Sequence, residues 1–96
     1  MVKVIAKSTL KPGSWEKATP LYREIIQETR KEEGCIEYTL YIDVSDENKC
    51  SIVETWESKE HLDAHMKTEH FIRIIPQLGE LCVAPIEISL LKEFKV

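Results

Sequence analysis

The sequence predicts an α+β fold of the ferredoxin-like type: a split βαβ unit with a four-stranded antiparallel sheet and two main helices on one face. Three observations predict it. Segments of alternating polarity occur near both ends and in the middle of the chain, an amphipathic helical stripe follows the first of them, and a helix-capping serine opens a second helical segment. With 96 residues and 43% hydrophobic composition, we expect one domain over residues 1–96.

The first strand is expected over residues 2–10, where a mostly apolar face alternates with a more polar one. After a turn, apolar residues recur at helical spacing from 15 to 29. Pro20 leaves two alternatives open, because proline removes one helical hydrogen bond. Either the helix starts early and kinks, or it starts with Thr19 as N-cap and Pro20 in its first position. Gly34 is expected to stop this helix.

The middle of the chain predicts two strands joined by a hairpin. The strands are expected at 36–43 and 49–56, and the polar residues 44–48 form the loop between them. The face of the second strand that carries Trp56 also carries Glu54. A carboxylate on an apolar face needs a polar partner or a raised pKa.

The last third of the chain predicts a helix, a short turn and a strand. Ser58 is a good N-cap for the helix, and Thr68 caps the short turn that Pro76 and Gly79 are expected to end. Alternation over 85–95 then predicts the final strand. The resulting order is β-α-β-β-α-β, which leaves one sheet face bare.

A bare apolar sheet face of this size exceeds what monomers usually expose. The strand at 49–56 carries apolar or mixed residues on both of its faces. We therefore expect a homodimer in which two copies pack sheet on sheet.

Composition excludes several classes of protein. The 13 Lys and Arg against 17 Asp and Glu give a net charge of −4, with no basic run, so a nucleic acid partner is not expected. No stretch approaches the ~20 apolar residues that span a bilayer, and the N-terminus lacks the apolar core of a signal peptide. A cytoplasmic protein is expected. Its three cysteines, Cys35, Cys50 and Cys82, are expected to be free thiols.

All three histidines follow the strand that carries Glu54, within ten residues of one another. His61 is expected to be solvated on the helix surface. His65 faces the side of the apolar helix residues, where a core role and a functional role are both open, and His70 could cap a helix or act in a site. A metal is not expected, because the pair His61 and His65 has no evident third ligand.

Taken together, these stretches resemble the antibiotic-biosynthesis monooxygenase family, and within it the bacterial quinol monooxygenases. The resemblance covers nearly the whole chain and rests on these segments: 4–6 through 11–13, 32–35, 54–58, His61-Leu62, Ala64-His65 and Thr68-Glu69-His70. It implies a dimeric α/β barrel, in which two ferredoxin-like protomers pack their sheets together.

The resemblance also implies an activity: oxygenation of a small hydroquinone- or anthrone-like aromatic by molecular oxygen, with no metal, flavin or other cofactor. His65 lies at a histidine of the family motif and is implied to be the catalytic base. Glu54 is implied to orient it. The residues implied to line the substrate pocket are Trp56, Met66, His70 and Phe71.

Proteins with this resemblance include enzymes of other kinds. Haem-degrading relatives use an asparagine, a tryptophan and a histidine where this chain has Ala6, His65 and Ile75, so haem degradation is not expected. A relative that isomerises or degrades a phosphorylated signalling sugar has a similar spacing of histidines and stays an alternative. A dimer that only binds a small molecule is the other, because a fold does not fix a function.

Overall fold

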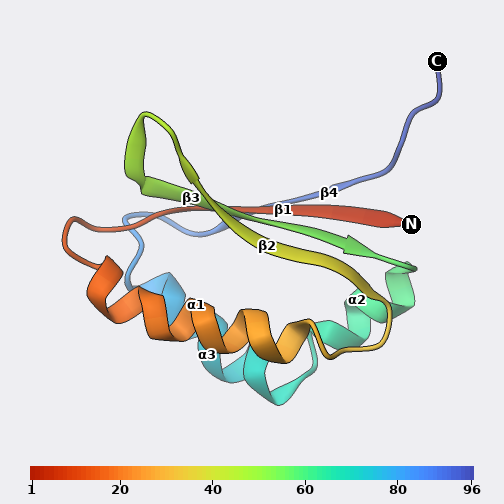
Figure 1. Cartoon of the computed structure of the whole chain (residues 1–96), viewed down its shortest axis with the longest axis horizontal. Helices are drawn as coiled ribbons and strands as arrows, with labels where there is room; N and C mark the ends of the chain where they lie inside the picture. The colour runs from red at the N-terminus through yellow and green to blue at the C-terminus, as the bar shows by residue number, and fades with distance from the viewer.

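The computed structural model covers residues 1–96 and contains one sheet with three helices packed beneath it (Figure 1). The strands are β1 (Val2–Thr9), β2 (Cys35–Asp43), β3 (Asp46–Trp56) and β4 (Glu87–Leu91). The helices are α1 (Trp15–Thr29), α2 (Lys59–His65) and α3 (Glu69–Glu80). The strand order is β2-β3-β1-β4 and every pairing is antiparallel. The predicted ferredoxin-like α+β fold is confirmed.

The register of the sheet places Glu54 near its middle. Glu54 lies opposite Val4 of β1 on one side and Tyr38 of β2 on the other. All three residues are buried, so this face of the sheet is the one that the helices cover. β3 begins at Asp46 rather than at residue 49, because the hairpin turn is tight: the backbone N–H and hydroxyl of Ser45 both donate to Asp43, at 2.8 and 2.6 Å.

Helix α1 follows the first of the two alternatives, because it begins at Trp15 and contains Pro20. The expectation for Gly34 is wrong, since α1 ends at Thr29 and Gly34 lies in the turn before β2 with φ +83°. A side chain there would also collide with the ring of His61, 2.3 Å from the position of a Cβ. Glycine is therefore required by both backbone conformation and close packing.

The two predicted caps are confirmed. The side chain of Ser58 accepts a hydrogen bond from the backbone of His61, and that of Thr68 accepts one from Phe71. The expected short turn is instead the twelve-residue helix α3, which continues through Pro76. The carbonyl that loses its partner to this proline belongs to Ile72, whose residue is 61% exposed, so water can replace the missing bond.

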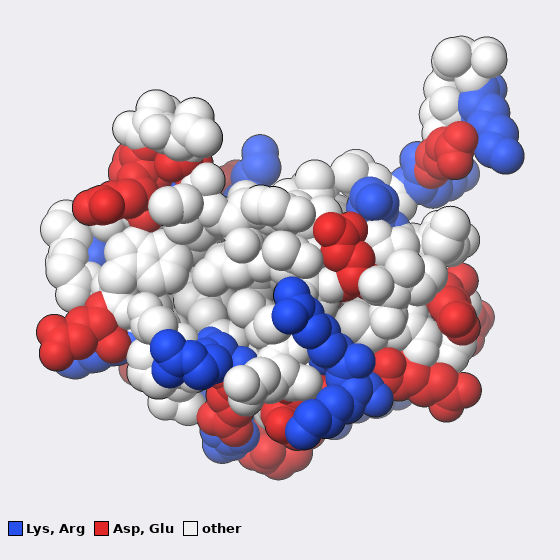
Figure 2. Space-filling model, viewed as in Figure 1, with Lys and Arg blue, Asp and Glu red and all other residues white.

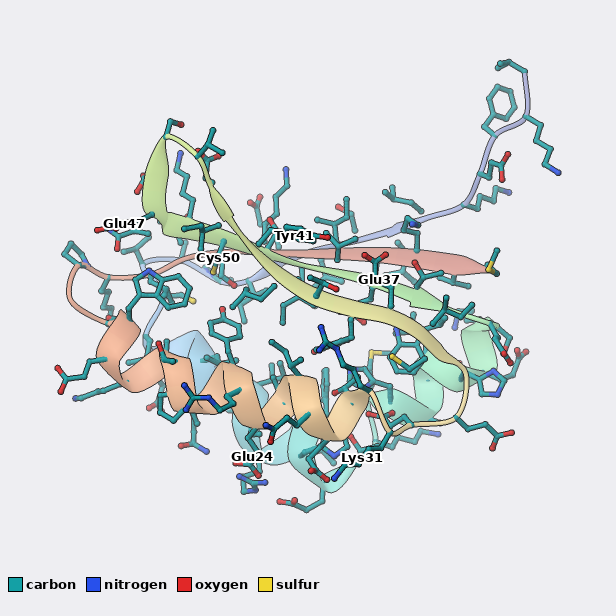
Figure 3. All side chains as sticks on the ribbon, viewed as in Figure 1. Glu24, Lys31, Glu37, Tyr41, Glu47 and Cys50 are labelled. Atoms are coloured by element: carbon teal, nitrogen blue, oxygen red, sulfur yellow. The ribbon has the colours of Figure 1, made fainter.

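The core lies between the helices and the sheet and contains a cluster of thirteen buried hydrophobic residues. The opposite sheet face is mixed rather than continuously apolar: Ile5 and Val53 alternate there with residues such as Lys7, and Figure 3 shows Glu37 and Tyr41 on this side. The expected apolar patch is thus smaller than the sequence suggested, because lysines and hydroxyl side chains interrupt it.

The surface charge is mixed, and no helix is suited to crossing a membrane. On the face shown in Figure 2, acidic and basic side chains are interspersed and neither sign forms a continuous patch. None of the helices combines the length and the apolar run that crossing a bilayer requires. Cys35, Cys50 and Cys82 are free, as predicted.

Candidate functional site

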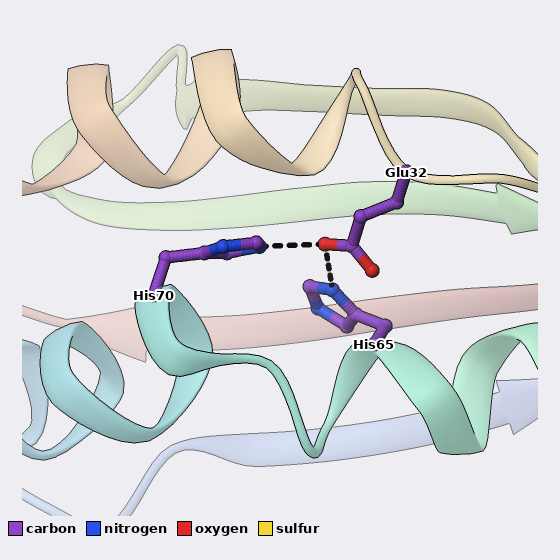
Figure 4. Close-up of side chains that lie close together, drawn as sticks. All are labelled: Glu32, His65 and His70. Atoms are coloured by element: carbon purple, nitrogen blue, oxygen red, sulfur yellow. Dashed lines mark hydrogen bonds and ion pairs between the residues drawn. The ribbon is translucent and has the colours of Figure 1, made fainter.

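Three side chains from different parts of the chain meet at one point, which we call the Glu32 cluster (Glu32, His65 and His70). His65 is the last residue of α2, His70 lies in the first turn of α3, and Glu32 lies in the loop after α1 (Figure 4). One oxygen of Glu32, Oε2, is 2.8 Å from His65 Nδ1 and 2.6 Å from His70 Nε2. The short connection between α2 and α3 places the two rings on either side of this oxygen.

The hydrogen bonds of the Glu32 cluster define which ring nitrogens carry protons. A carboxylate oxygen only accepts, so His65 Nδ1–H and His70 Nε2–H must both donate. In a neutral His65 ring, the other nitrogen, Nε2, then has a free lone pair. His65 is 1% exposed and Nε2 has no hydrogen-bond partner. A buried polar atom without a partner costs about 1–3 kcal/mol.

Aromatic rings surround His65. Its ring centroid lies 4.8 Å from Trp56, 5.0 Å from Phe71 and 5.5 Å from Tyr38. Burial lowers the pKa of His65 below its ordinary 6.5, and the hydrogen bond to Glu32 opposes that shift only in part. His65 is therefore neutral at pH 7 and able to accept a proton at Nε2.

Glu54 is also buried, at 6% exposed, and accepts a hydrogen bond of 2.9 Å from the indole Nε1 of Trp56. Burial raises the pKa of Glu54 to about 7; the bond from Trp56 lowers it, and the charge of Glu32 raises it. No hydrogen bond joins Glu54 to His65. The carboxylate that is hydrogen bonded to His65 is that of Glu32, whereas the carboxylate of Glu54 accepts its hydrogen bond from the indole of Trp56.

A cavity of about 70 Å³ lies between the sheet and α3, next to this aromatic cage. Tyr38 and Phe71 contact His65 and also line the cavity, and Glu54 contributes a carboxylate to its wall. The complete lining is Ala6, Ser8, Tyr22, Tyr38, Ile52, Glu54, Phe71, Ile75, Leu78, Ile86 and Ile88. It is mostly apolar and contains no lysine or arginine.

Only some of the residues predicted to form the site line this cavity. Glu54 and Phe71 line the cavity, whereas Trp56 and His65 are buried against each other and do not line it. His70 belongs to the Glu32 cluster and does not line the cavity. Met66 is 41% exposed and lies outside the cavity, although its backbone still continues the helical turn of α2.

His61 is not the solvated side chain that the sequence predicts. Its Nδ1 is hydrogen bonded to the hydroxyl of Ser58 at 2.8 Å, and its ring covers Gly34. His61 thus joins α2 to the turn before β2. It has no contact with the Glu32 cluster in the hydrogen-bond network.

Two residues of the site were missed by sequence reasoning. Glu32 lies in an irregular loop, where neither helical nor strand periodicity assigns a direction to its side chain. Tyr38 lies on the apolar face of its strand and is typical of a core residue there. The available signal for Glu32 was its place in the segment 32–35, one of those that carry the family resemblance.

The Glu32 cluster also brings together side chains that can bind a metal, which the sequence did not lead us to expect. The ligand atoms of the Glu32 cluster all lie within 4.8 Å of one another. The pair His61 and His65 has no third ligand here either; the three donors that meet are a different set, in which His65 is joined by His70 and by the distant Glu32. Thiol chemistry is not favoured at this end of the molecule, because burial raises the pKa of Cys35 to about 11.

Comparisons with known proteins agree on one family. The model of the antibiotic biosynthesis monooxygenase family matches residues 1–77. A probable quinol monooxygenase of Escherichia coli is 34% identical over 80 residues, covering 73% of this chain and 77% of that protein. An uncharacterized protein of Synechocystis is 30% identical over 91 residues; the match covers 95% of this chain but only 62% of that protein.

Solved structures show the same fold. The crystal structure of a conserved protein from Methanosarcina mazei superposes with a TM-score of 0.95 at 32% identity, covering 97% of this chain and 92% of that one.

Proposed function

Because the chain belongs to the antibiotic biosynthesis monooxygenase family, we propose that it is a monooxygenase for a small hydroquinone- or anthrone-like substrate, with His65 as the catalytic base. In this proposal the enzyme needs no metal, flavin or other cofactor. The substrate binds between the sheet and α3, and molecular oxygen is the second substrate.

The unpartnered Nε2 of His65 carries this proposal. It is a neutral nitrogen base in an aromatic enclosure, and a phenolic hydroxyl would supply the hydrogen bond that it lacks. A phenol of pKa ~10 is ionised about one part in a thousand at pH 7, so removing its proton costs about 4 kcal/mol. A positioned base lowers this barrier.

The chemistry balances without an added reductant. His65 Nε2 takes the phenolic proton, and the resulting anion gives an electron to oxygen. A carbon–oxygen bond then forms as a hydroperoxide, whose oxygen–oxygen bond breaks with loss of water. A hydroquinone C₆H₆O₂ and O₂ would thus give a hydroxyquinone C₆H₄O₃ and H₂O, with four electrons passing from the substrate to oxygen.

Glu32 has a positioning role in this scheme. Its oxygen holds His65 in the tautomer that carries the proton on Nδ1, and it faces the positive charge that appears on the ring after proton transfer. His70 donates to the same oxygen and keeps the carboxylate in place. Glu54, whose pKa is raised to about 7, lines the cavity and can exchange a proton at neutral pH.

The cavity has to widen when a substrate binds. Its volume of about 70 Å³ is below the ~150 Å³ of a cavity that can hold a benzene ring. Phe71 and Ile75 of α3 form one wall, and Ile88 of β4, 56% exposed, forms the outer rim. Movement of α3 away from β4 would therefore open the cavity at this edge of the sheet.

Two further parts of the proposal concern the protein as a whole. We propose a homodimer in which the uncovered sheet faces pack together, supported by Ile5 and Val53 on that face. An 11 kDa species in light scattering at micromolar concentration would contradict it. We also propose a cytoplasmic location, which the three free cysteines support.

The cavity chemistry separates this proposal from its alternatives. A phosphorylated sugar would require cationic or multiple hydrogen-bonding groups, and no lysine or arginine lines the cavity. A protein that only binds its ligand would not consume oxygen.

The test is oxygen uptake with a panel of hydroquinones and anthrones in buffer treated with a chelator. The proposal predicts uptake that depends on enzyme and substrate, with one water formed per O₂ and no net hydrogen peroxide. Binding of these compounds without any oxygen uptake would support the binding protein instead.

A further inference from the structure

We propose that the Glu32 cluster is a binding site for one divalent transition-metal ion of the Zn²⁺ type, held by a Glu32 carboxylate oxygen, His65 Nδ1 and His70 Nε2. The site lies behind the catalytic nitrogen, on the other side of the His65 ring from Nε2.

The geometry already gathers the three donor atoms. Both histidine nitrogens lie within 2.8 Å of the same carboxylate oxygen, and the whole set lies within 4.8 Å. Zinc binds histidine nitrogen and carboxylate oxygen at about 2.0–2.2 Å. An ion between the three groups would therefore replace the two hydrogen bonds after shifts of the order of one ångström.

The donor set has the chemistry of a metal site. Two histidines and one glutamate are a combination that zinc uses with an open fourth position, and imidazole also suits Co²⁺, Ni²⁺ and Cu²⁺. The site can be reached from solvent, because the side chains of Glu32 and His70 are each 14% exposed. His65 is buried and held by Trp56, so one ligand is rigidly placed.

Metal binding would change the tautomer of His65. In the metal-free protein the proton is on Nδ1, where it bonds to Glu32, and Nε2 carries the lone pair. A metal takes the lone pair of Nδ1, so in a neutral ring the proton must move to Nε2. The nitrogen that faces the enclosure then becomes a donor and can no longer accept a proton.

This consequence rests on the proposed function: the bound ion would inhibit the oxygenation, and a chelator would restore it. Binding itself does not depend on the function. The two can therefore fail separately, because metal binding is measured without substrate.

The experiment is a titration of the chelator-treated protein with Co²⁺, followed by its visible absorption, and with Zn²⁺, followed by calorimetry. We expect one ion per chain, Co²⁺ bands typical of four- or five-coordination, and competition of Zn²⁺ for the same site. In protein with ¹⁵N-labelled histidine, Zn²⁺ should move the proton of His65 from Nδ1 to Nε2.

Matched variants locate the site. Glu32→Gln and His70→Ala should each weaken Zn²⁺ binding at least tenfold, whereas Glu33→Gln, which alters a neighbouring exposed carboxylate outside the cluster, should not. Circular dichroism confirms that each variant is folded. His70→Gln replaces His70→Ala if the latter unfolds.

Three outcomes would overturn the proposal: no binding of either ion up to millimolar concentration, equal affinity in wild type and Glu32→Gln, or an unchanged His65 tautomer at saturating Zn²⁺.

Discussion

The space between the helices and the sheet has two ends that differ in kind. At the end near the start of α1, Tyr22 and Cys50 form a hydrogen bond of 3.4 Å, and the ring of Trp15 lies 5.8 Å from that of Tyr22. We call this the closed end; Cys50 is labelled in Figure 3. At the other end are His65 with the Glu32 cluster, and Glu54 with Trp56 (Figure 4).

The difference lies in how the polar groups are satisfied. At the closed end the hydroxyl and thiol satisfy each other, and burial raises the pKa of Tyr22 above its usual value, so it stays neutral. At the other end one buried nitrogen has no partner and one buried carboxyl titrates near neutral pH. Such groups reduce stability, and they collect where binding and proton transfer take place.

The largest expected effect tests this contrast directly. His65→Ala should lower the turnover of an accepted hydroquinone by about 10²–10⁴-fold, because it removes the base. Oxygen uptake measures the rate, and light scattering with circular dichroism checks the assembly and fold. Unchanged turnover in a folded variant would show that another group is the base; His70 is then the next candidate.

Glu54→Gln should change how stability depends on pH. The folded pKa of Glu54, about 7, lies above its ordinary 4.5, so the folded state binds the extra proton between these values. The contribution of protonated Glu54 to folding stability is fully present below pH 4.5 and is lost as the pH rises through 7. Glutamine does not titrate and still accepts from Trp56.

Between pH 4 and pH 8, the free energy of unfolding of Glu54→Gln should therefore rise by about 3 kcal/mol relative to that of wild type. Urea unfolding at several pH values measures this difference, in which the titration of His65 cancels. Glu33→Gln, at an exposed position, is the control and should show a much smaller change. A constant difference between wild type and Glu54→Gln would contradict the raised pKa.

Glu32→Gln should have a smaller effect on catalysis than His65→Ala, of about tenfold. The base is still present, but the neutral amide no longer opposes the positive charge that forms on its ring, and Nδ1 is less firmly protonated. The pKa of His65 should fall further, because the contribution of Glu32 raises it. Measured by NMR, a His65 pKa that rises in Glu32→Gln would show that this hydrogen bond has been assigned wrongly.

The smallest effect is expected at the closed end. Tyr22→Phe removes the bond to Cys50 and should lower the free energy of unfolding by about 1 kcal/mol. Tyr22 also lines the cavity, so turnover is measured alongside stability and should fall far less than in His65→Ala, because Tyr22 takes no part in the proton transfer. A large loss of activity with unchanged stability would mean that the two ends are not functionally distinct.

Sequence patterns predicted the regular parts of the molecule well, for physical reasons. Alternation in the first three strands and the caps Ser58 and Thr68 are local signals, and the structure follows them. The last strand, expected over 85–95, is shorter: β4 spans only Glu87–Leu91, and Phe94 beyond it is exposed. The path of α3 through Pro76 was missed, because tolerance of a proline depends on whether the freed carbonyl can reach water.

The site was harder to predict, since its key contact joins residues 33 positions apart. Glu54 and His65 were correctly expected to be buried, but nothing in the sequence indicates that the indole of Trp56 takes up one carboxylate. The second carboxylate, Glu32, comes from a loop whose direction depends on Gly34 and its packing against His61.

The most direct test of the central claim is the protonation of His65 in the resting enzyme. Histidine-specific ¹⁵N labelling, assigned with the His65→Ala variant, reports which ring nitrogen carries the proton in metal-free protein near pH 7. We predict a proton on Nδ1 and none on Nε2, with protonation of Nε2 only below pH 6.5, since burial lowers the pKa of this ring. A resting His65 that carries its proton on Nε2 at pH 7 would contradict its assignment as the base.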